Sequence, residues 1–224
     1  MKKVRRRKFN FTKFILFLLF LFLIIYLIYN LLSINIKNII VKNTYFLTDE
    51  EVIETAKLEN YPSFFKTSSN TIKNRLLKHD LINKIDIKKK FGYVVEISVK
   101  EYKVLFLERS SGKYILDNKT EINMASLTGV PTLINYVVDS VKEKLIEKLS
   151  EVDYDVLTKI SEIEYSPTSY DEERFLLYMN DGNLVYITLN KIDEFKKYIE
   201  IKQELEGKKG ILYLDSGNYF EIKE

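Results

Sequence analysis

The sequence predicts an α+β fold in which one transmembrane helix precedes two domains that mix strands with helices. The first observation is an apolar run of 23 residues without charge near the start of the chain, at 14–36. The second is a region in which the hydrophobic spacing changes from a strand to two helices and back to strands. The third is a longer region in which short β-like runs alternate with turn residues and two amphipathic stretches.

The apolar run is long enough to cross a membrane as a helix. At ~1.5 Å per residue it would extend ~34 Å, and the hydrocarbon core of a bilayer is ~30 Å thick. Residues 1–13 carry seven lysines and arginines and no acid, and the positive-inside bias keeps such a tail in the cytoplasm. A cleaved signal peptide is the alternative, but its apolar core would be shorter and a small-residue cleavage site would follow. We therefore expect an uncleaved anchor at 14–36, with the rest of the chain exported.

Composition excludes several classes of function. The formal net charge is +3 although the tail alone holds seven positive charges, so the exported part is net acidic, which argues against nucleic-acid binding. The chain has no cysteine, which excludes disulfides, thiolate nucleophiles and cysteine-ligated metals. His79 is the single histidine, which excludes paired-histidine metal sites, and it is expected at a helix end or on a solvated face. We expect no catalytic residue, no metal and no cofactor.

One short string matches a catalytic motif. Ser63-Phe64-Phe65-Lys66 has the form S-x-x-K, in which the serine is the nucleophile of penicillin-recognising enzymes. The partner motif K-T-G is absent from the sequence. An anchored cell-wall enzyme is therefore a weak hypothesis, and we expect no labelling of Ser63 or Lys66 by penicillin.

The first region after the anchor predicts the element order β-α-α-β-β. Residues 39–41 form a short β-like run. Thr48–Glu51 has the pattern of a capping box at the start of a helix, and one of residues 68–70 can cap a second helix. Two strands follow at 85–87 and 93–99, the second with a clear period of two. Helices can then cover one face of a small sheet and leave the other face solvated.

The longer C-terminal region predicts a sheet with two flanking helices. Strands are expected at 104–108, 113–116, 160–165, 174–179, 184–188, 211–214 and 219–222. One helix is expected from the spacing of Val141, Leu145, Leu149 and Val152, and another from Ile192, Phe195, Ile199 and Leu205. The last strand is expected to run from Tyr213 to Ile222, and the sequence holds no downstream strand to cover it. An edge strand of this kind is a template for another chain.

Several strings resemble one family. Ile39 to Thr44 reads I-x-V-x-N-T and is followed by T-D-E-E-V-I, which resembles the start of a POTRA (polypeptide-transport-associated) domain. Val95-x-Ile97-x-Val99-x-Glu101 resembles the end of that domain in the FtsQ/DivIB cell-division proteins. The chain departs from the family at Asn43, where a Gly is usual, and at Val104, where a Pro is usual. Asn tolerates a positive φ, so the turn at 43 can survive.

The resemblance continues through the rest of the chain. Tyr114-Ile115-Leu116-Asp117 is similar to the family's "y-x-x-D" hairpin, and Val130-Pro131-Thr132-Leu133 to its "L-P-x-L". The resemblance implies four segments: a basic cytoplasmic tail at 1–13, a transmembrane helix at 14–36, a POTRA domain at 37–103 and a β domain at 104–224.

The resemblance also implies a function. The protein would be a non-enzymatic cell-division scaffold, single-pass in the cell (inner) membrane, with a cytoplasmic N-terminus and an extracytoplasmic C-terminus at the division septum. Its C-terminal strand would dock small bitopic coiled-coil division proteins (FtsB or DivIC, with FtsL) by strand addition, and its POTRA domain would recruit other divisome proteins. Carried onto this sequence, the partner-binding residues are Leu212, Tyr213, Leu214, Asp215, Ser216, Gly217, Asn218, Tyr219 and Phe220.

Two alternatives stay open. The last strand is equally well explained as paired inside the sheet, with Glu221, Lys223 and Glu224 as charges that protect an edge. The second alternative is a POTRA-type chaperone or assembly factor for exported proteins. That class normally repeats its POTRA units or continues into a membrane barrel, whereas this sequence has one POTRA-like region and ends at residue 224.

Overall fold

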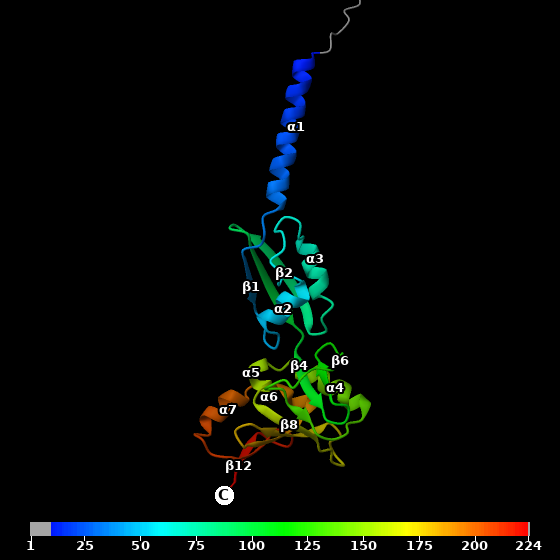
Figure 1. The fold of residues 1–224 in the computed structure, drawn as a ribbon. Coiled ribbons are helices and arrows are strands. Elements are labelled where there is room, and N and C mark those ends of the chain that lie inside the picture. Colours follow the sequence, from blue (N-terminus) through cyan, green and yellow to red (C-terminus); the bar gives the residue numbers. More distant parts are fainter. Residues whose placement is uncertain (1–9, 224) are drawn as a thin grey trace, which may run out of the picture. The chain divides into compact units, whose positions relative to one another are not determined.

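The computed structural model describes residues 10–223, so most of the predicted basic tail lies outside the described residues. Contacts divide the chain into two compact units, Met1–Glu101 and Tyr102–Glu224, and each is described here by itself. The first unit holds one long helix and a small α+β fold, and the second holds a large mixed sheet with helices, so the predicted α+β class is confirmed (Figure 1). The expected limits of the four segments stay a prediction.

The first helix, α1 (Phe11–Leu32), is long and apolar enough to cross a membrane by length and composition. Its most apolar window has a mean hydropathy of 2.8 and is not buried within the protein. The helix begins where the Asn10 side chain accepts from the Lys13 amide, and it ends at Ser33, whose Oγ donates to the Tyr29 carbonyl at 2.8 Å. Side chains of this kind satisfy backbone groups that a helix end leaves unpaired.

The helix α1 starts before the apolar run at 14–36 and ends inside it, and the reason for its end lies in the neighbouring fold. The Ile34 carbonyl accepts from the Phe64 amide at 2.8 Å, and the Ile36 amide donates to the Pro62 carbonyl at 3.0 Å. These bonds require an extended backbone after Ser33. Ile36, which the sequence assigned to the membrane, is buried in the core of the α+β fold.

The small fold confirms the predicted order β-α-α-β-β. Its elements are β1 (Asn38–Lys42), α2 (Asp49–Ala56), α3 (Ser69–Leu76), β2 (Ile82–Lys90) and β3 (Val94–Glu101). The sheet order is β1-β3-β2, with β1 parallel and β2 antiparallel to β3. Both helices lie against one face of this sheet (Figure 1). That face carries the alternate residues of β3 that are fully buried, Val95, Ile97 and Val99.

Hydrogen bonds and backbone angles at neighbouring residues explain where α2 and α3 begin and how the chain turns after β1. The capping box is present, with the Thr48 side chain accepting from the Glu51 amide and the Glu51 carboxylate accepting from the Thr48 amide at 2.8 Å. Ser68 caps α3 by accepting from the Thr71 amide at 3.1 Å. Asn43 adopts a φ of 62°, so the turn after β1 survives without a glycine.

The solvated face of this sheet carries a shared ion pair. The Glu96 carboxylate lies 2.7 Å from the Lys42 ammonium and 2.6 Å from that of Lys90. Hydrogen bonds from Lys42 and Lys90 lower the pKa of Glu96 to about 2. Glu96 therefore stays charged in the folded state although its side chain is nearly buried.

This ion pair predicts a pH dependence. Because the pKa of Glu96 is lower in the folded state than its ordinary value of 4.5, the pair stabilises the first unit fully above that value. The contribution is lost as the pH falls from there toward 2. An NMR titration of the Glu96 carboxyl should give the low pKa, and Glu96→Gln should remove this part of the acid sensitivity. A Glu96 that titrates near its ordinary pKa would contradict the prediction.

The second unit is built on a nine-stranded mixed sheet. Its strands are β4 (Val104–Glu108), β5 (Lys113–Leu116), β6 (Glu121–Ile122), β7 (Thr132–Leu133), β8 (Ile160–Tyr165), β9 (Arg174–Met179), β10 (Leu184–Thr188), β11 (Gly210–Tyr213) and β12 (Tyr219–Ile222). Their order is β12-β11-β10-β9-β8-β7-β4-β5-β6. The helical segments are α4 (Asp139–Ser150), α5 (Tyr154–Leu157), η1 (Leu189–Lys191), α6 (Ile192–Phe195) and α7 (Tyr198–Glu204).

The expected single helix over Ile192–Leu205 was wrong, because the chain breaks between α6 and α7. Phe195 and Tyr198 are both fully buried. The Tyr198 hydroxyl lies 3.0 Å from the Asp181 carboxylate and 3.2 Å from the Asn183 amide nitrogen. Because the chain turns at Lys197, the rings of Phe195 and Tyr198 both lie in the core. The Tyr198 hydroxyl keeps its hydrogen bonds in this arrangement. The predicted α4 face, by contrast, is confirmed, since Val141, Leu145 and Leu149 are buried.

Candidate functional site

The predicted partner-binding residues lie in a hairpin at one edge of the large sheet. The β segments expected at 211–214 and 219–222 are confirmed as β11 and β12, whereas the expectation of one continuous last strand from Tyr213 to Ile222 was wrong, because a turn separates the two. β11 pairs in parallel with β10 and antiparallel with β12, so it is an interior strand. Within the described part of the chain, β12 is the last strand of the sheet on this side. On this side of the sheet, strand addition within the described residues would therefore use β12.

The nine predicted residues divide accordingly. Leu212, Tyr213 and Leu214 lie in or next to β11, with both leucines buried, the segment 215–218 forms the turn, and Tyr219 and Phe220 begin β12. The Leu214 amide donates to the Tyr186 carbonyl at 2.8 Å, which continues the β10–β11 ladder by one residue. The predicted residues are thus close together, but only the last two lie on the strand that a partner could reach.

Gly210 allows β12 to pair closely with β11. A Cβ at Gly210 would lie 1.9 Å from the Glu221 carbonyl oxygen, which no side chain could occupy. The Gly210 amide donates to the Asn183 side-chain oxygen at 3.0 Å. The Asn183 side chain is buried, and its nitrogen donates to the Tyr198 hydroxyl. The start of the hairpin is therefore fixed by a glycine and by a buried amide from the turn between β9 and β10.

Aromatic rings cross the outer face of these strands. The Arg174 guanidinium lies 3.8 Å from the centre of the Tyr186 ring, an effective cation–π arrangement. Tyr213 stacks on Tyr186 at 5.4 Å and on Tyr219 at 4.6 Å. The Tyr213 hydroxyl also donates to Glu221 at 3.1 Å, and this bond raises the pKa of Tyr213. The stack joins β9, β10, β11 and β12, so it holds the edge strand in register.

The turn of the hairpin is anchored by charge. The Asp215 carboxylate accepts from the Arg174 Nε at 2.6 Å and from the Ser216 amide at 2.8 Å. The Lys191 ammonium donates to the Asp215 carbonyl at 3.0 Å. Burial would raise the pKa of Asp215, but the bonds from Arg174 and Ser216 outweigh it and the pKa is lowered. Asp215 is therefore a structural member of the predicted site rather than a free charge.

The edge of β12 presents backbone groups to solvent. The Lys223 amide donates to the Lys209 carbonyl at 2.9 Å, and the register pairs Ile211 with Glu221 and Tyr213 with Tyr219. In an antiparallel ladder the residues that bond the neighbouring strand alternate with residues that do not. The amides and carbonyls of Phe220 and Ile222 therefore point away from β11, where another strand could bind them.

A hollow of about 260 Å³ lies between this hairpin and the helices α6 and α7. Its walls are mostly apolar, and two acidic side chains stand among them. The residues that line it are Glu194, Ile201, Glu204, Leu205, Leu212, Leu214, Asn218, Tyr219 and Phe220. The hollow could receive an apolar side chain from a segment that binds along β12.

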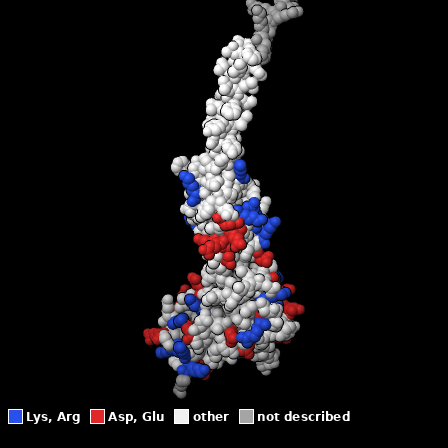
Figure 2. Space-filling model, viewed as in Figure 1, with Lys and Arg blue, Asp and Glu red and all other residues white. Residues whose placement is uncertain are grey.

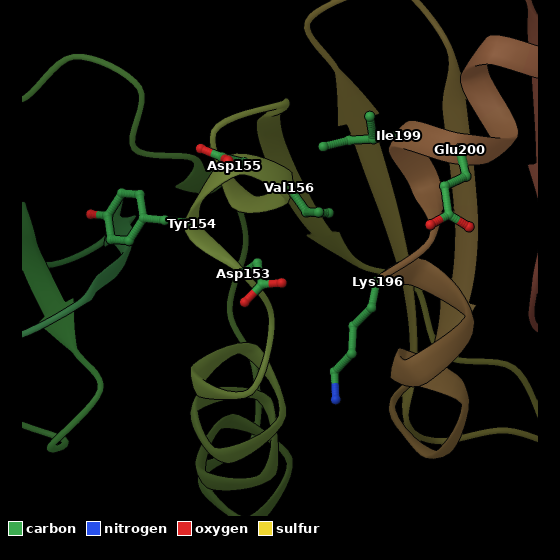
Figure 3. A pocket seen from close by; sticks show the side chains of 7 residues that line it. All are labelled: Asp153, Tyr154, Asp155, Val156, Lys196, Ile199 and Glu200. Atoms are coloured by element: carbon green, nitrogen blue, oxygen red, sulfur yellow. The ribbon is translucent and has the colours of Figure 1, made fainter.

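A second hollow of about 450 Å³ lies between α5 and α7 in the same unit. Figure 3 shows charged side chains around it, with the Tyr154 ring directed away from them. The Tyr154 hydroxyl donates to the Val104 carbonyl at 3.3 Å. Lys196 bonds to Asp193 at 2.6 Å and to Glu151 at 3.4 Å. The charge of this lysine is compensated within the unit, so we interpret the hollow as solvated surface.

The S-x-x-K string has a structural role. The Ser63 hydroxyl donates to the Leu32 carbonyl at 2.6 Å and accepts from the Lys66 amide at 3.3 Å. The Lys66 side chain is exposed. His79 lies at the end of α3, as expected, and its Nδ1 accepts from the Leu81 amide at 3.3 Å.

The fold defines a class of protein with one candidate membrane helix, a β-α-α-β-β domain and a large mixed sheet. Residues 34–102 match the model of the POTRA domain, FtsQ-type. The chain is 32% identical over 197 residues to the cell division protein DivIB of Bacillus cytotoxicus, an alignment that covers 84% of this chain and 76% of that protein. It is 26% identical over 193 residues to DivIB of Bacillus subtilis (strain 168), with 83% and 73% covered.

A solved structure also resembles this chain. The major extracytoplasmic domain of the trans isomer of the cell division protein DivIB from Geobacillus stearothermophilus matches with a TM-score of 0.40 and 24% identity, over 48% of this chain and 96% of that one. On the strength of the sequence relatives, the chain belongs to the DivIB/FtsQ family of cell-division proteins. A role in cell division follows from this membership.

Proposed function

We propose that this protein is a non-enzymatic scaffold of the division machinery and that a partner binds it by adding a strand to β12. The observation that carries the proposal is the edge of β12, where the backbone groups of Phe220 and Ile222 point to solvent beside an apolar hollow. Main-chain hydrogen bonds would supply affinity, and alternate side chains in the hollow would supply specificity.

The proposed partners are the small bitopic coiled-coil proteins of the division machinery, of the FtsB or DivIC type together with FtsL. α1 would anchor the protein in the cell membrane at the septum, with the N-terminus in the cytoplasm and both folded units outside. The POTRA domain at 37–103 would recruit further division proteins, and the β domain at 104–224 would hold the strand-addition edge. The length of α1, the seven basic residues within 1–13 and the family membership support this arrangement.

A proline on β12 tests strand addition directly. Ile222→Pro removes an amide that points away from β11, so the internal ladder keeps its bonds, as for prolines tolerated on edge strands. We expect partner affinity to fall about tenfold or more, because an unmade backbone hydrogen bond costs ~1–3 kcal/mol and 1.4 kcal/mol is a factor of ten. The measurement is co-purification and titration of the detergent-solubilised full chain with each coiled-coil partner.

Ile222→Ala is the matched control, because it removes the same side chain and keeps the amide. We expect the alanine variant to bind within a few-fold of the native chain. Circular dichroism and thermal melting show that both variants are folded. Equal binding by the proline and alanine variants, with folding retained, would mean that the partner does not use this edge.

A further inference from the structure

The end of α1 is tied to two loops of the POTRA fold. The Ser63 hydroxyl donates to the Leu32 carbonyl at 2.6 Å, and the Phe64 amide donates to the Ile34 carbonyl at 2.8 Å. The Lys37 amide donates to the Tyr93 carbonyl at 2.9 Å. The loop 61–67 and the β2–β3 turn 91–93 therefore lie beside the point where the chain leaves α1. We call these two segments, together with Lys37 and the end of β2 at 88–90, the aromatic collar.

Three rings of the collar form a fixed group. Phe64, Phe65 and Tyr93 contact one another edge to face, with ring centres 5.2–6.2 Å apart. The Lys89 ammonium donates to the Phe64 and Thr67 carbonyls, which fastens the loop to β2. Phe91, at the tip of the turn, is completely exposed, with a relative accessibility of 104%. Tyr61 and Phe65 of the loop 61–67 are also exposed, so apolar surface gathers at the collar rather than lying singly.

The collar is also basic. The segments 34–37, 61–67 and 88–94 hold five lysines and no acidic residue. Lys37 lies 5.4 Å from the centre of the Tyr93 ring, and Lys66, Lys88 and Lys90 are exposed. Lys88 is paired with Asp86 and Lys90 with Glu96. In Figure 2 the face of α1 in view is white, and lysine or arginine side chains lie at the end of the POTRA fold that follows it.

We propose that the aromatic collar binds the extracytoplasmic leaflet of the membrane that α1 crosses, with the Phe91 ring among the lipid chains and the lysines at anionic headgroups. Aromatic rings favour the headgroup level of a bilayer, and interfacial binding combines buried apolar area with attraction to anionic lipid. The collar lies within hydrogen-bonding distance of the end of α1, so the leaflet is the surface nearest to it. Lipid contact at this point would restrict how the POTRA domain can rotate about α1.

The chain contains no tryptophan, so a single introduced tryptophan reports on its own site. The experiment reconstitutes full-length Phe91→Trp into vesicles of phosphatidylcholine, with and without phosphatidylglycerol, and measures emission and its quenching by brominated lipid chains. We expect emission at shorter wavelength than in water, strong quenching, and more quenching in the anionic vesicles. Adding Lys37→Gln and Lys66→Gln to this variant should remove the difference between the two lipid mixtures.

Two further tryptophan variants are controls, one for the insertion of α1 and one for a side chain exposed to water. The inference rests on the proposed membrane span, so Leu23→Trp, in the middle of α1, must be quenched if α1 is inserted. Tyr170→Trp, on a fully exposed side chain of the second unit, should emit as in water. Quenching of Leu23→Trp without quenching of Phe91→Trp would overturn the collar proposal and leave the span intact. Emission of Phe91→Trp that shifts only when a partner protein is added would overturn it in favour of a protein interface.

Discussion

Gly210→Ala is expected to separate β12 from β11 and to abolish partner binding at that edge. The added Cβ would lie 1.9 Å from the Glu221 carbonyl oxygen and 2.9 Å from the Phe220 ring. The first of these atoms belongs to the backbone, so it cannot move aside as the end of a flexible side chain could. Inserted atoms in a close-packed site typically cost ~1–3 kcal/mol or more, which is enough to open a four-residue edge strand.

The expected result is specific to the hairpin. Hydrogen exchange of the Tyr219 and Glu221 amides should accelerate strongly, while exchange in β8 and β9 changes little. Gly217→Ala is the matched control, because a Cβ at Gly217 would meet only the Tyr219 ring at 3.4 Å or more. Unchanged exchange in β12 of the Gly210→Ala protein would show that the strands are less closely paired than the structure indicates.

Glu101→Gln is expected to loosen the POTRA fold at the turn between β1 and α2. The Glu101 carboxylate accepts from the Tyr45 and Phe46 amides at 2.9 Å and from the Leu47 amide at 3.2 Å. A carboxylate that collects successive backbone amides joins this turn to the end of β3. A neutral amide keeps one acceptor oxygen in place of two, and hydrogen bonds to charged groups contribute ~1.5–3 kcal/mol. We therefore expect a loss of about 2–3 kcal/mol of local stability.

This loss should be local and measurable. Hydrogen exchange of the three amides at residues 45–47 should rise, and unfolding of the first unit by urea should shift to lower concentration. Glu59→Gln, which changes an exposed glutamate of the same unit, is the control and should have little effect. Equal exchange at residues 45–47 in both variants would mean that the turn is held by its other contacts.

The sequence was most informative where structure follows from neighbouring residues. The capping box at Thr48–Glu51, the alternation along β3 and the helical spacing of α4 each depend on contacts within a few residues, and each was predicted. The resemblance to the FtsQ/DivIB family added the order of the domains, which no single motif defines.

The errors share a cause, since each depends on a residue distant in sequence. α1 ends at Leu32 because the loop near Ser63 takes the backbone that follows. The helix before Gly207 breaks because Tyr198 bonds to Asp181 and Asn183. Sequence patterns report the amphipathic period of a segment but not the partner that interrupts it.

At the candidate site, too, the sequence predicted local features but not the contacts between residues distant in sequence. The sequence predicted the two C-terminal β segments but not which of them lies at the edge of the sheet, and it missed Arg174 and Tyr186, which hold the hairpin from β9 and β10. Arg and Tyr in a strand carry no signal of this role before the sheet order is known. Tyr213 is stacked between two rings, so Tyr213→Lys would disturb the fold. Tyr219→Lys, on a half-exposed ring of the edge strand, is the more informative change for binding.

The most direct test of strand addition is the hydrogen exchange of two amides, Phe220 and Ile222, in the full chain with and without its coiled-coil partner. Both amides point away from β11 in the unbound protein, so they should exchange rapidly there. Protection of both amides on binding, with little change at Tyr219 and Glu221, is the predicted result because only the outer groups gain a partner strand. Binding that leaves Phe220 and Ile222 in rapid exchange would contradict the account and move the interface to another surface of the protein.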